Sequence, residues 1–135
     1  MDEQEQQEVY RIAHEYFLQE LGSEERAQDA LAKLATLVQE EGVKLVHIGN
    51  VLFLVIVRGE GVVEVHTIGI ETNPRELAQN FANLAAYLQN IGVKVGYTYT
   101  EDNRFGRIAR MTGLPIQQTQ AVIGDKKVNV YIMEF

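Results

Sequence analysis

Apolar residues recur at steps of three and four along the start of the chain, which is the spacing of amphipathic helices. One stripe occupies residues 9–21 and a second occupies 27–38. Gly22 stops the first helix, and Ser23 caps the second by accepting a hydrogen bond from a free backbone N–H of its first turn. Residues 1–8 are rich in Gln and Glu, and we expect them to fray.

The pattern then changes to continuous β-branched and aromatic runs, which are typical of strands. The runs at 44–48, 51–57 and 62–70 are separated by short gaps that contain glycine. This arrangement predicts two hairpins and three antiparallel strands. The run at 51–57 is almost wholly apolar, so we expect that strand to be covered on both faces.

A long helix is predicted next, over 74–91, and Asn73 is a good N-cap for it. A further strand follows at 93–99. Because a strand, a helix and a second strand form a crossover unit, the strands at 62–70 and 93–99 are predicted to be parallel neighbours.

The last part of the chain predicts a short helix near 102–112 and two strands near 116–123 and 128–134. A hairpin at 124–127 joins these strands. We therefore predict one α/β domain over residues 1–135, with the element order α-α-β-β-β-α-β-α-β-β.

The net charge of −7 is placed unevenly. Residues 1–41 hold eleven acidic and three basic side chains, a balance of −8, while residues 42–135 have a balance of +1. An acidic face repels phosphate, which argues against binding of DNA or RNA through it. The face is either a solvated surface or a docking face for a basic partner.

The absence of cysteine excludes disulfides, thiol catalysis and cysteine-based metal sites. No run approaches the roughly 18 consecutive apolar residues of a membrane helix. The acidic and polar first twenty residues do not fit a secretory signal. We therefore expect a cytoplasmic protein without a membrane partner.

Two short segments carry a resemblance to a known family. Glu64-Val65-His66 lies on the strand before the long helix, and an Arg-x-Ala-Arg-x-x-Gly-hydrophobic run occupies 107–114. With the element order over 24–135, they make the chain resemble the GCN5-related N-acetyltransferase (GNAT) superfamily, in particular its small divergent members in tailed bacteriophages. The resemblance implies a mixed, mostly antiparallel sheet with one central parallel strand pair, and a place in the host cytoplasm or the virion.

The resemblance also implies acetyl-CoA as cofactor. In the superfamily it lies where two parallel strands splay apart, with its pyrophosphate on backbone N–H groups at the start of the long helix. The implied contacts are Ile68, Ile70, Thr72, Asn73, Arg75, Asn103 and Arg107. The superfamily's glycine-rich turn is missing, because no glycine lies between Ile70 and Ala82. Arg75 can offset this loss by a bidentate phosphate contact. Alternatively, residues 73–76 are simply a well-made helix start.

Superfamily members use a general base on the strand before the long helix and a tyrosine that protonates the leaving thiolate. Glu64 and His66 are the candidate bases, because residues two apart on a strand face the same side. The usual tyrosine position falls on Ala109, so the acid would be Tyr97 or Tyr99. The alternative is that Glu64 and His66 lie on a partly solvated face of the sheet and that the two tyrosines only contribute to packing.

Two further patterns complete the candidates. His47 lies on a neighbouring strand, but its pairing with Glu64 and His66 is too weak a pattern to predict a metal site, and none is predicted. Three arginines recur at every third residue and would form one basic stripe on a helix: Arg104, Arg107 and Arg110. This stripe can reach CoA phosphates, pair with acidic residues of another subunit, or remain solvated.

Two functions therefore stay open. One is an acyl-CoA N-acyltransferase that acts on a small amine or a protein amine. A variant of this function is the same type of domain with weak or lost catalysis. The other is a non-catalytic phage structural or assembly protein that uses the GNAT fold as a protein-binding scaffold. The missing glycine turn and tyrosine favour the second, while the strand–helix–strand core fits both. The strand that usually precedes the first helices is also missing, which leaves a sheet edge for a second copy or a phage protein.

Overall fold

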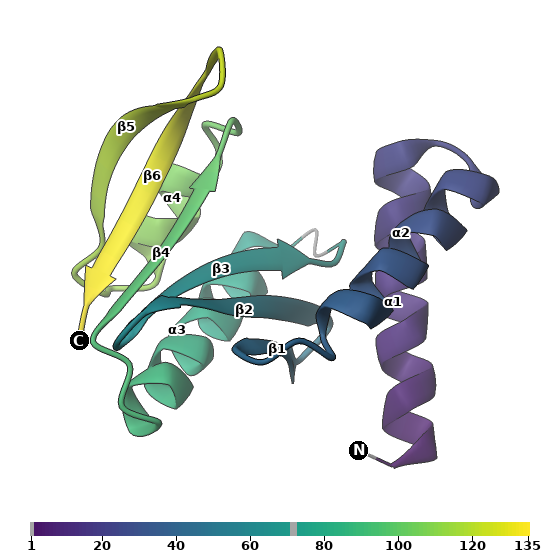
Figure 1. Ribbon diagram of the computed structural model, residues 1–135. Coiled ribbons are helices and arrows are strands. Elements are labelled where there is room, and N and C mark those ends of the chain that lie inside the picture. The colour runs from purple at the N-terminus through teal and green to yellow at the C-terminus, as the bar shows by residue number, and fades with distance from the viewer. Residues whose placement is uncertain (1, 71–72) are drawn as a thin grey trace. The chain divides into compact units, whose positions relative to one another are not determined.

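The computed structural model describes residues 2–70 and 73–135, and its elements follow the predicted order (Figure 1). The helices of this described part are α1 (Glu3–Leu21), α2 (Glu24–Leu37), α3 (Pro74–Asn90) and α4 (Phe105–Met111). The strands are β1 (Val43–Ile48), β2 (Val51–Gly59), β3 (Val62–Ile68), β4 (Val95–Thr100), β5 (Gln117–Ile123) and β6 (Lys126–Glu134).

The strands form one six-stranded sheet with the order β1-β2-β3-β4-β6-β5. β3 and β4 are parallel, whereas β6 is antiparallel to both β4 and β5. Turns at 49–50 and 60–61 join the first three strands as the two predicted hairpins. The predicted fold class is confirmed: the sheet is mixed and mostly antiparallel, with one parallel pair.

By its internal contacts the described chain divides into two compact units. One comprises residues 2–55 and 67–70, and the other comprises 56–66 and 73–135. Each unit is described by itself below. In the described part of the chain, no helix is both long enough and apolar enough to cross a membrane.

In the first unit, side-chain caps fix the ends of the helix pair. The Asp2 carboxylate accepts a hydrogen bond from the Glu5 N–H at 2.7 Å, so α1 begins at Glu3 and takes in most of the segment that was expected to fray. The Ser23 hydroxyl caps α2 as predicted, because it accepts a hydrogen bond from the backbone N–H of Arg26 at 3.2 Å. The predicted burial of the apolar run holds over Val51–Val55, but Val57 at its end is 55% exposed.

β3 ends two residues earlier than the predicted strand, and the chain comes close to Val51 directly after this end. Gly69 has a φ of 156°, and a Cβ at this position would lie 2.8 Å from Cγ1 of Val51. A larger side chain there would force the two segments apart, so the glycine permits the contact.

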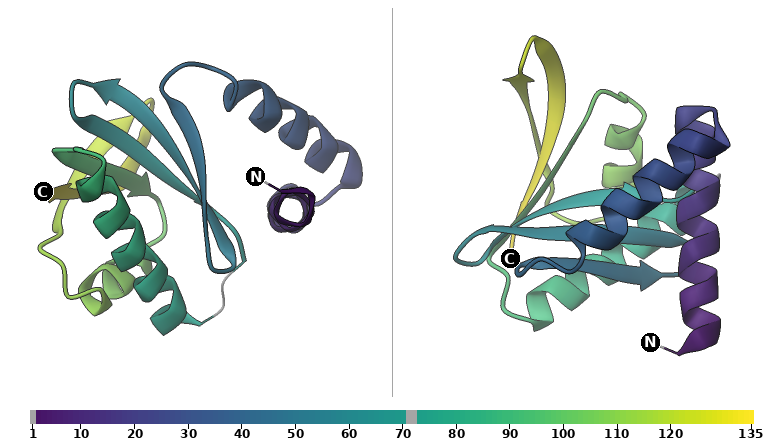
Figure 2. Two further views of the ribbon diagram at one scale, coloured as in Figure 1. Left: turned by 90° about the horizontal axis from the view of Figure 1, so that it is seen from below. Right: turned by 45° about the vertical axis from the view of Figure 1, so that its right-hand side comes forward.

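In the second unit, one turn residue anchors the start of the parallel pair. The Gly61 carbonyl accepts hydrogen bonds from the backbone nitrogens of Lys94 and Val95, at 2.7 Å and 2.9 Å. Both α3 and α4 cover the same face of β4 and β6 (Figure 2). The buried residues Val63, Val65, Leu84 and Leu88 belong to the core between this sheet face and α3.

Candidate functional site

The parallel pair is paired only where it begins. The register matches Val62 with Val95, Val63 with Gly96, and Glu64 with Tyr97. β4 continues to Thr100 beyond these pairs, and the two strands diverge past Glu64 (Figure 1). The predicted splay of the parallel strands is therefore present, and it begins at a glutamate and a tyrosine.

The Glu64 carboxylate is the centre of a hydrogen-bonded cluster. Its Oε1 accepts from the Tyr97 hydroxyl at 3.0 Å and from Nε of Arg58 at 3.3 Å. Its Oε2 lies 2.5 Å from Nε2 of His66 and 3.4 Å from Nη2 of Arg58. Only 8% of the Glu64 side chain is exposed. A buried carboxylate with donors on both oxygens is held in one orientation.

These contacts set the charge of the cluster. Burial raises the pKa of Glu64, but the hydrogen bonds from His66, Arg58 and Tyr97 outweigh it and hold the pKa below the ordinary glutamate value. Burial and the contact with Glu64 raise the pKa of the Tyr97 hydroxyl. Glu64 is thus an anion that accepts hydrogen bonds at neutral pH. It is better suited to orienting His66 than to acting as the general base itself.

His66 is partly accessible to solvent, with 31% of its side chain exposed. When Nε2 donates to Glu64, the imidazole is in the tautomer that leaves the Nδ1 lone pair available. Nδ1 has no partner among the described residues. The His66 ring also meets the Tyr99 ring edge-on, with centroids 5.2 Å apart.

The structure thus brings together the four residues that were predicted as catalytic, and it distinguishes between the tyrosines. The Tyr97 hydroxyl is engaged by Glu64. No hydrogen bond of the Tyr99 hydroxyl is found within the described ranges. Sequence reasoning missed Arg58, although its opposite charge across the predicted hairpin was a signal that could have found it.

The start of α3 differs from a phosphate-binding helix start. Oδ1 of Asn73 accepts from the backbone nitrogens of Arg75 and Glu76, at 3.0 Å and 3.5 Å. Pro74 has no N–H. The first-turn donors that would meet a pyrophosphate are therefore already capped, while the Arg75 side chain is exposed and has no partner in the described part of the chain.

The other predicted cofactor contacts are divided between the two units. Ile68 is buried and Ile70 is 40% exposed, both in the first unit. Thr72 lies outside the described residues. In the second unit, Oδ1 of Asn103 accepts from the buried Asn129 amide at 2.9 Å, and Arg107 is exposed.

The three arginines of the predicted stripe are exposed; Arg107 and Arg110 lie on α4, and Arg104 directly precedes it. Arg104 is held by the Asp102 carboxylate, 2.8 Å from Nη2, which keeps the pKa of Asp102 below its ordinary value. Arg107 and Arg110 form no ion pair with any described residue. Two of the three cations are therefore open to an anionic partner.

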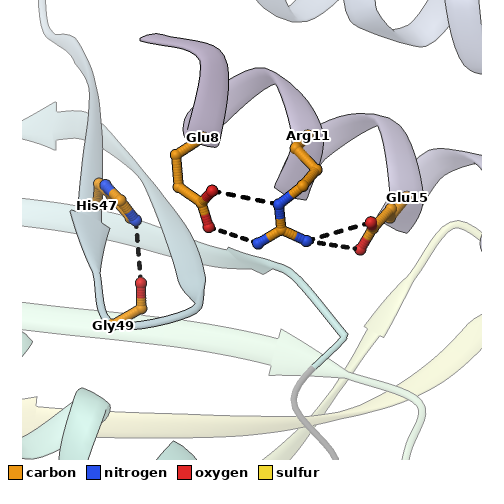
Figure 3. Close-up of polar contacts among 5 residues, drawn as sticks. All are labelled: Glu8, Arg11, Glu15, His47 and Gly49. Carbon is orange, nitrogen blue, oxygen red and sulfur yellow. Dashed lines mark hydrogen bonds and ion pairs between the residues drawn. The ribbon is translucent and has the colours of Figure 1, made fainter. Parts of the chain in front are cut away.

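His47 forms a polar contact within its own hairpin. Its Nε2 lies 2.9 Å from the Gly49 carbonyl, next to the network in which Arg11 bridges Glu8 and Glu15 on α1 (Figure 3). Over the described ranges, no group of three or more His, Cys, Asp or Glu side chains has the geometry to hold a metal ion.

An apolar cavity of about 70 Å³ lies on the α3 and α4 side of the second unit and is partly open to solvent. Val65 and Thr98, the first residues beyond the paired register, both line it. Tyr131 lines it from β6, is 3% exposed, and has a hydroxyl that is buried without a hydrogen-bond partner in the described structure. Burial raises the pKa of this hydroxyl. Such an unpaired group is unusual in a folded core.

No protein-family model and no curated protein matches the sequence. Several solved GNAT acetyltransferases match the structure. The aminoglycoside acetyltransferase AAC(6')-Ib in complex with ribostamycin and coenzyme A has a TM-score of 0.66 at 13% identity, over 99% of this chain and 90% of that one. A mutant of spermidine N-acetyltransferase SpeG from Vibrio cholerae has a TM-score of 0.59 at 13% identity, over 78% and 74%.

A GNAT family acetyltransferase from Elizabethkingia anophelis with acetyl-CoA bound has a TM-score of 0.59 at 11% identity, over 92% of this chain and 91% of that one. At these identities the likeness is one of architecture. The chain therefore has the fold of the GNAT acetyltransferases.

Proposed function

We propose that the chain is an acyl-CoA-dependent N-acyltransferase that binds acetyl-CoA where β3 and β4 diverge. The observation that carries the proposal is the contact between Glu64 and His66 at the last residue pair of the parallel register. It supplies an oriented imidazole at the place where the fold's strands part. Structures of the same fold hold coenzyme A or acetyl-CoA, which supports this choice of cofactor.

In this proposal the acceptor amine attacks the thioester carbonyl carbon, and a C–N bond forms. Nδ1 of His66 takes the proton that the amine loses, and the Glu64 carboxylate stabilises the resulting imidazolium. The C–S bond then breaks, and the thiolate of CoA takes a proton from a tyrosine. Tyr99 is the better donor because its hydroxyl is not engaged by another described residue, whereas Tyr97 is held by Glu64. Glu64 is thus a positioning residue.

The proposed acceptor is a small amine. The structural neighbours include acetyltransferases of spermidine and of aminoglycosides, both of which are small polyamines. A protein amine is the wider alternative, which a panel of acceptors distinguishes.

A second candidate function is a non-catalytic binding scaffold, such as a phage structural or assembly protein. The capping of the Arg75 and Glu76 nitrogens by Asn73 favours it, because this cap occupies the donors that would meet the pyrophosphate. In an acyltransferase, the CoA phosphates would be bound by the exposed arginine side chains, namely Arg75, Arg107 and Arg110.

Thermal unfolding of the full chain with added acetyl-CoA separates the two functions. A ligand at a hundred times its dissociation constant stabilises the folded state by about 2.7 kcal/mol. Stabilisation by acetyl-CoA, together with release of free thiol in the presence of spermidine, supports the enzyme. No shift at millimolar acetyl-CoA contradicts it, and a homogeneous large assembly in size-exclusion chromatography then supports the scaffold.

A further inference from the structure

We infer that the apolar cavity beside the diverging strands receives the acyl chain of the donor, and that its size selects a butyryl group over an acetyl group. This inference rests on the proposed function and adds the class of acyl donor to it. Its test uses variants at residues that have no part in the proposed acid–base chemistry.

The first support is the position of the cavity. Val65 and Thr98 follow directly on the last paired residues of β3 and β4, and both line the cavity. A thioester placed where the strands part would have these residues beside its carbonyl group. The acyl chain can continue from there into the space beneath α3 and α4 without crossing a hydrogen-bonded pair of strands.

The second support is the chemistry of the lining. The remaining walls come mostly from aliphatic and aromatic residues of α3, α4, β4, β6 and the segments that follow α4 and β6, and almost no polar surface faces the space. The rings of Phe81 and Phe105 meet edge-on at 5.0 Å, which fixes one wall. An apolar cavity of this kind favours a hydrocarbon chain over water, because water would find too few polar partners there.

The third support is the size. One water takes up about 30 Å³ of liquid, so a cavity of about 70 Å³ holds roughly two groups of that size. Butyryl has two more carbons than acetyl. Each buried methylene improves binding by about 0.8 kcal/mol, which is about fourfold in affinity. Two buried methylenes therefore predict that butyryl-CoA binds about fifteenfold more tightly than acetyl-CoA.

Gly96 offers a clean way to fill the cavity. It lines the space, and a Cβ at this position would lie 3.5 Å from the Phe135 ring and 3.9 Å from Cδ1 of Leu88, both of which also line it. These are ordinary van der Waals distances, and Gly96 does not have a positive φ. The substitution Gly96→Ala therefore adds a methyl group without backbone strain.

Gly59 is the matched control, because it too lacks a positive φ, its only near neighbour would be Cβ of Val62 at 3.9 Å, and it does not line the cavity. Met133→Ala is the complementary variant, since it removes part of the lining and enlarges the space. All three chains are compared by thermal unfolding first, so that a folding defect is recognised.

The experiment measures dissociation constants for CoA, acetyl-CoA, butyryl-CoA and hexanoyl-CoA by calorimetry on the full chain. The expected result is an affinity gain of about fifteenfold from acetyl to butyryl. Gly96→Ala should lose most of that gain, Gly59→Ala should not change it, and Met133→Ala should shift the preference toward hexanoyl. Equal affinities for all thioesters, or a gain that Gly96→Ala leaves intact, overturn the inference and leave the proposed function standing. Failure of every thioester and of CoA to bind overturns both.

Discussion

Oε2 of Glu64 lies 2.5 Å from Nε2 of His66, two residues further along the same strand. Residues at this spacing share a face, so the contact is local and needs only that neither side chain turns away. What makes it more than a local contact is that Arg58 and Tyr97 hold the same carboxylate from neighbouring strands. The Glu64 carboxylate is therefore held in one orientation, and so is the imidazole of His66 that it contacts.

The proposed roles of His66 as general base and Glu64 as positioning residue predict different losses of kcat when each is substituted. His66→Gln removes the base, and we expect kcat to fall by about a hundredfold or more with little change in KM for acetyl-CoA. Glu64→Gln keeps the shape but not the charge that stabilises the imidazolium, so we expect a smaller fall in kcat. Release of CoA thiol from pH 6 to pH 9 measures both.

The matched control for these variants is Glu60→Gln, an exposed glutamate on the same hairpin. Its activity should equal that of the unmodified chain. A structural role of His66 alone would lower stability without changing the pH profile of kcat. If His66→Gln retains full kcat at every pH, the assignment of the base is wrong.

The low pKa of Glu64 predicts how stability changes in acid. The folded state holds this carboxyl ionised to a lower pH than the unfolded chain does. Its stabilising contribution is therefore complete above the ordinary glutamate pKa of about 4.3 and is lost as the pH falls through the lower folded value. Glu64→Gln should be less stable than the unmodified chain at pH 6, and the difference should shrink by pH 3.5.

Urea unfolding at the two pH values measures this difference. Asp102 and Glu24 also have lowered pKa values, so the unmodified chain loses stability in acid for more than one reason. The comparison with Glu64→Gln isolates one carboxyl. A difference that is the same at pH 6 and pH 3.5 would show that Glu64 does not titrate with folding.

The capped start of α3 predicts that affinity for CoA depends on a side chain and not on backbone donors. Arg75→Ala should weaken acetyl-CoA binding by about tenfold to a hundredfold, because a hydrogen bond to a charged group contributes about 1.5–3 kcal/mol. Asn73→Ala should cost about 1 kcal/mol of stability through the lost cap. Calorimetric titration and urea unfolding measure the two effects.

Arg26→Ala, an exposed arginine on α2, is the control for charge, and it should leave the affinity unchanged. If Asn73→Ala instead tightens acetyl-CoA binding, the freed nitrogens of Arg75 and Glu76 are the phosphate donors. The Asn73 side chain would then be what blocks the backbone phosphate site that the superfamily resemblance implies.

Two tyrosines predict opposite changes in stability on conversion to phenylalanine. Tyr131→Phe removes a buried hydroxyl that has no partner among the described residues, so we expect stability to rise by about 1 kcal/mol. Tyr97→Phe removes the hydrogen bond to the Glu64 carboxylate, and we expect a loss of about 1–2 kcal/mol. Urea unfolding of both variants at pH 7 checks the contrast; a loss in Tyr131→Phe would mean that its hydroxyl is bonded in solution.

The sequence by itself determined the order of the elements, the parallel pair and most element ends. These follow from local chemistry: hydrophobic period separates helices from strands, and side chains such as Asn73 and Ser23 satisfy the helix ends beside them. The pairing of β3 with β4 was predictable because a crossover through one helix leaves few other arrangements. Glu64 and His66 could be selected as a pair for the same local reason.

Only the tertiary structure decided what each candidate group is bonded to. That the Tyr97 hydroxyl reaches Glu64 while the Tyr99 ring meets His66 depends on the register between two strands whose residues are far apart in the chain. The unpaired hydroxyl of Tyr131 depends on packing among α4, β5 and β6. Hydrogen bonds and cavities between distant segments are set by distances of a few ångström, and a pattern of residue types along one chain does not contain those distances.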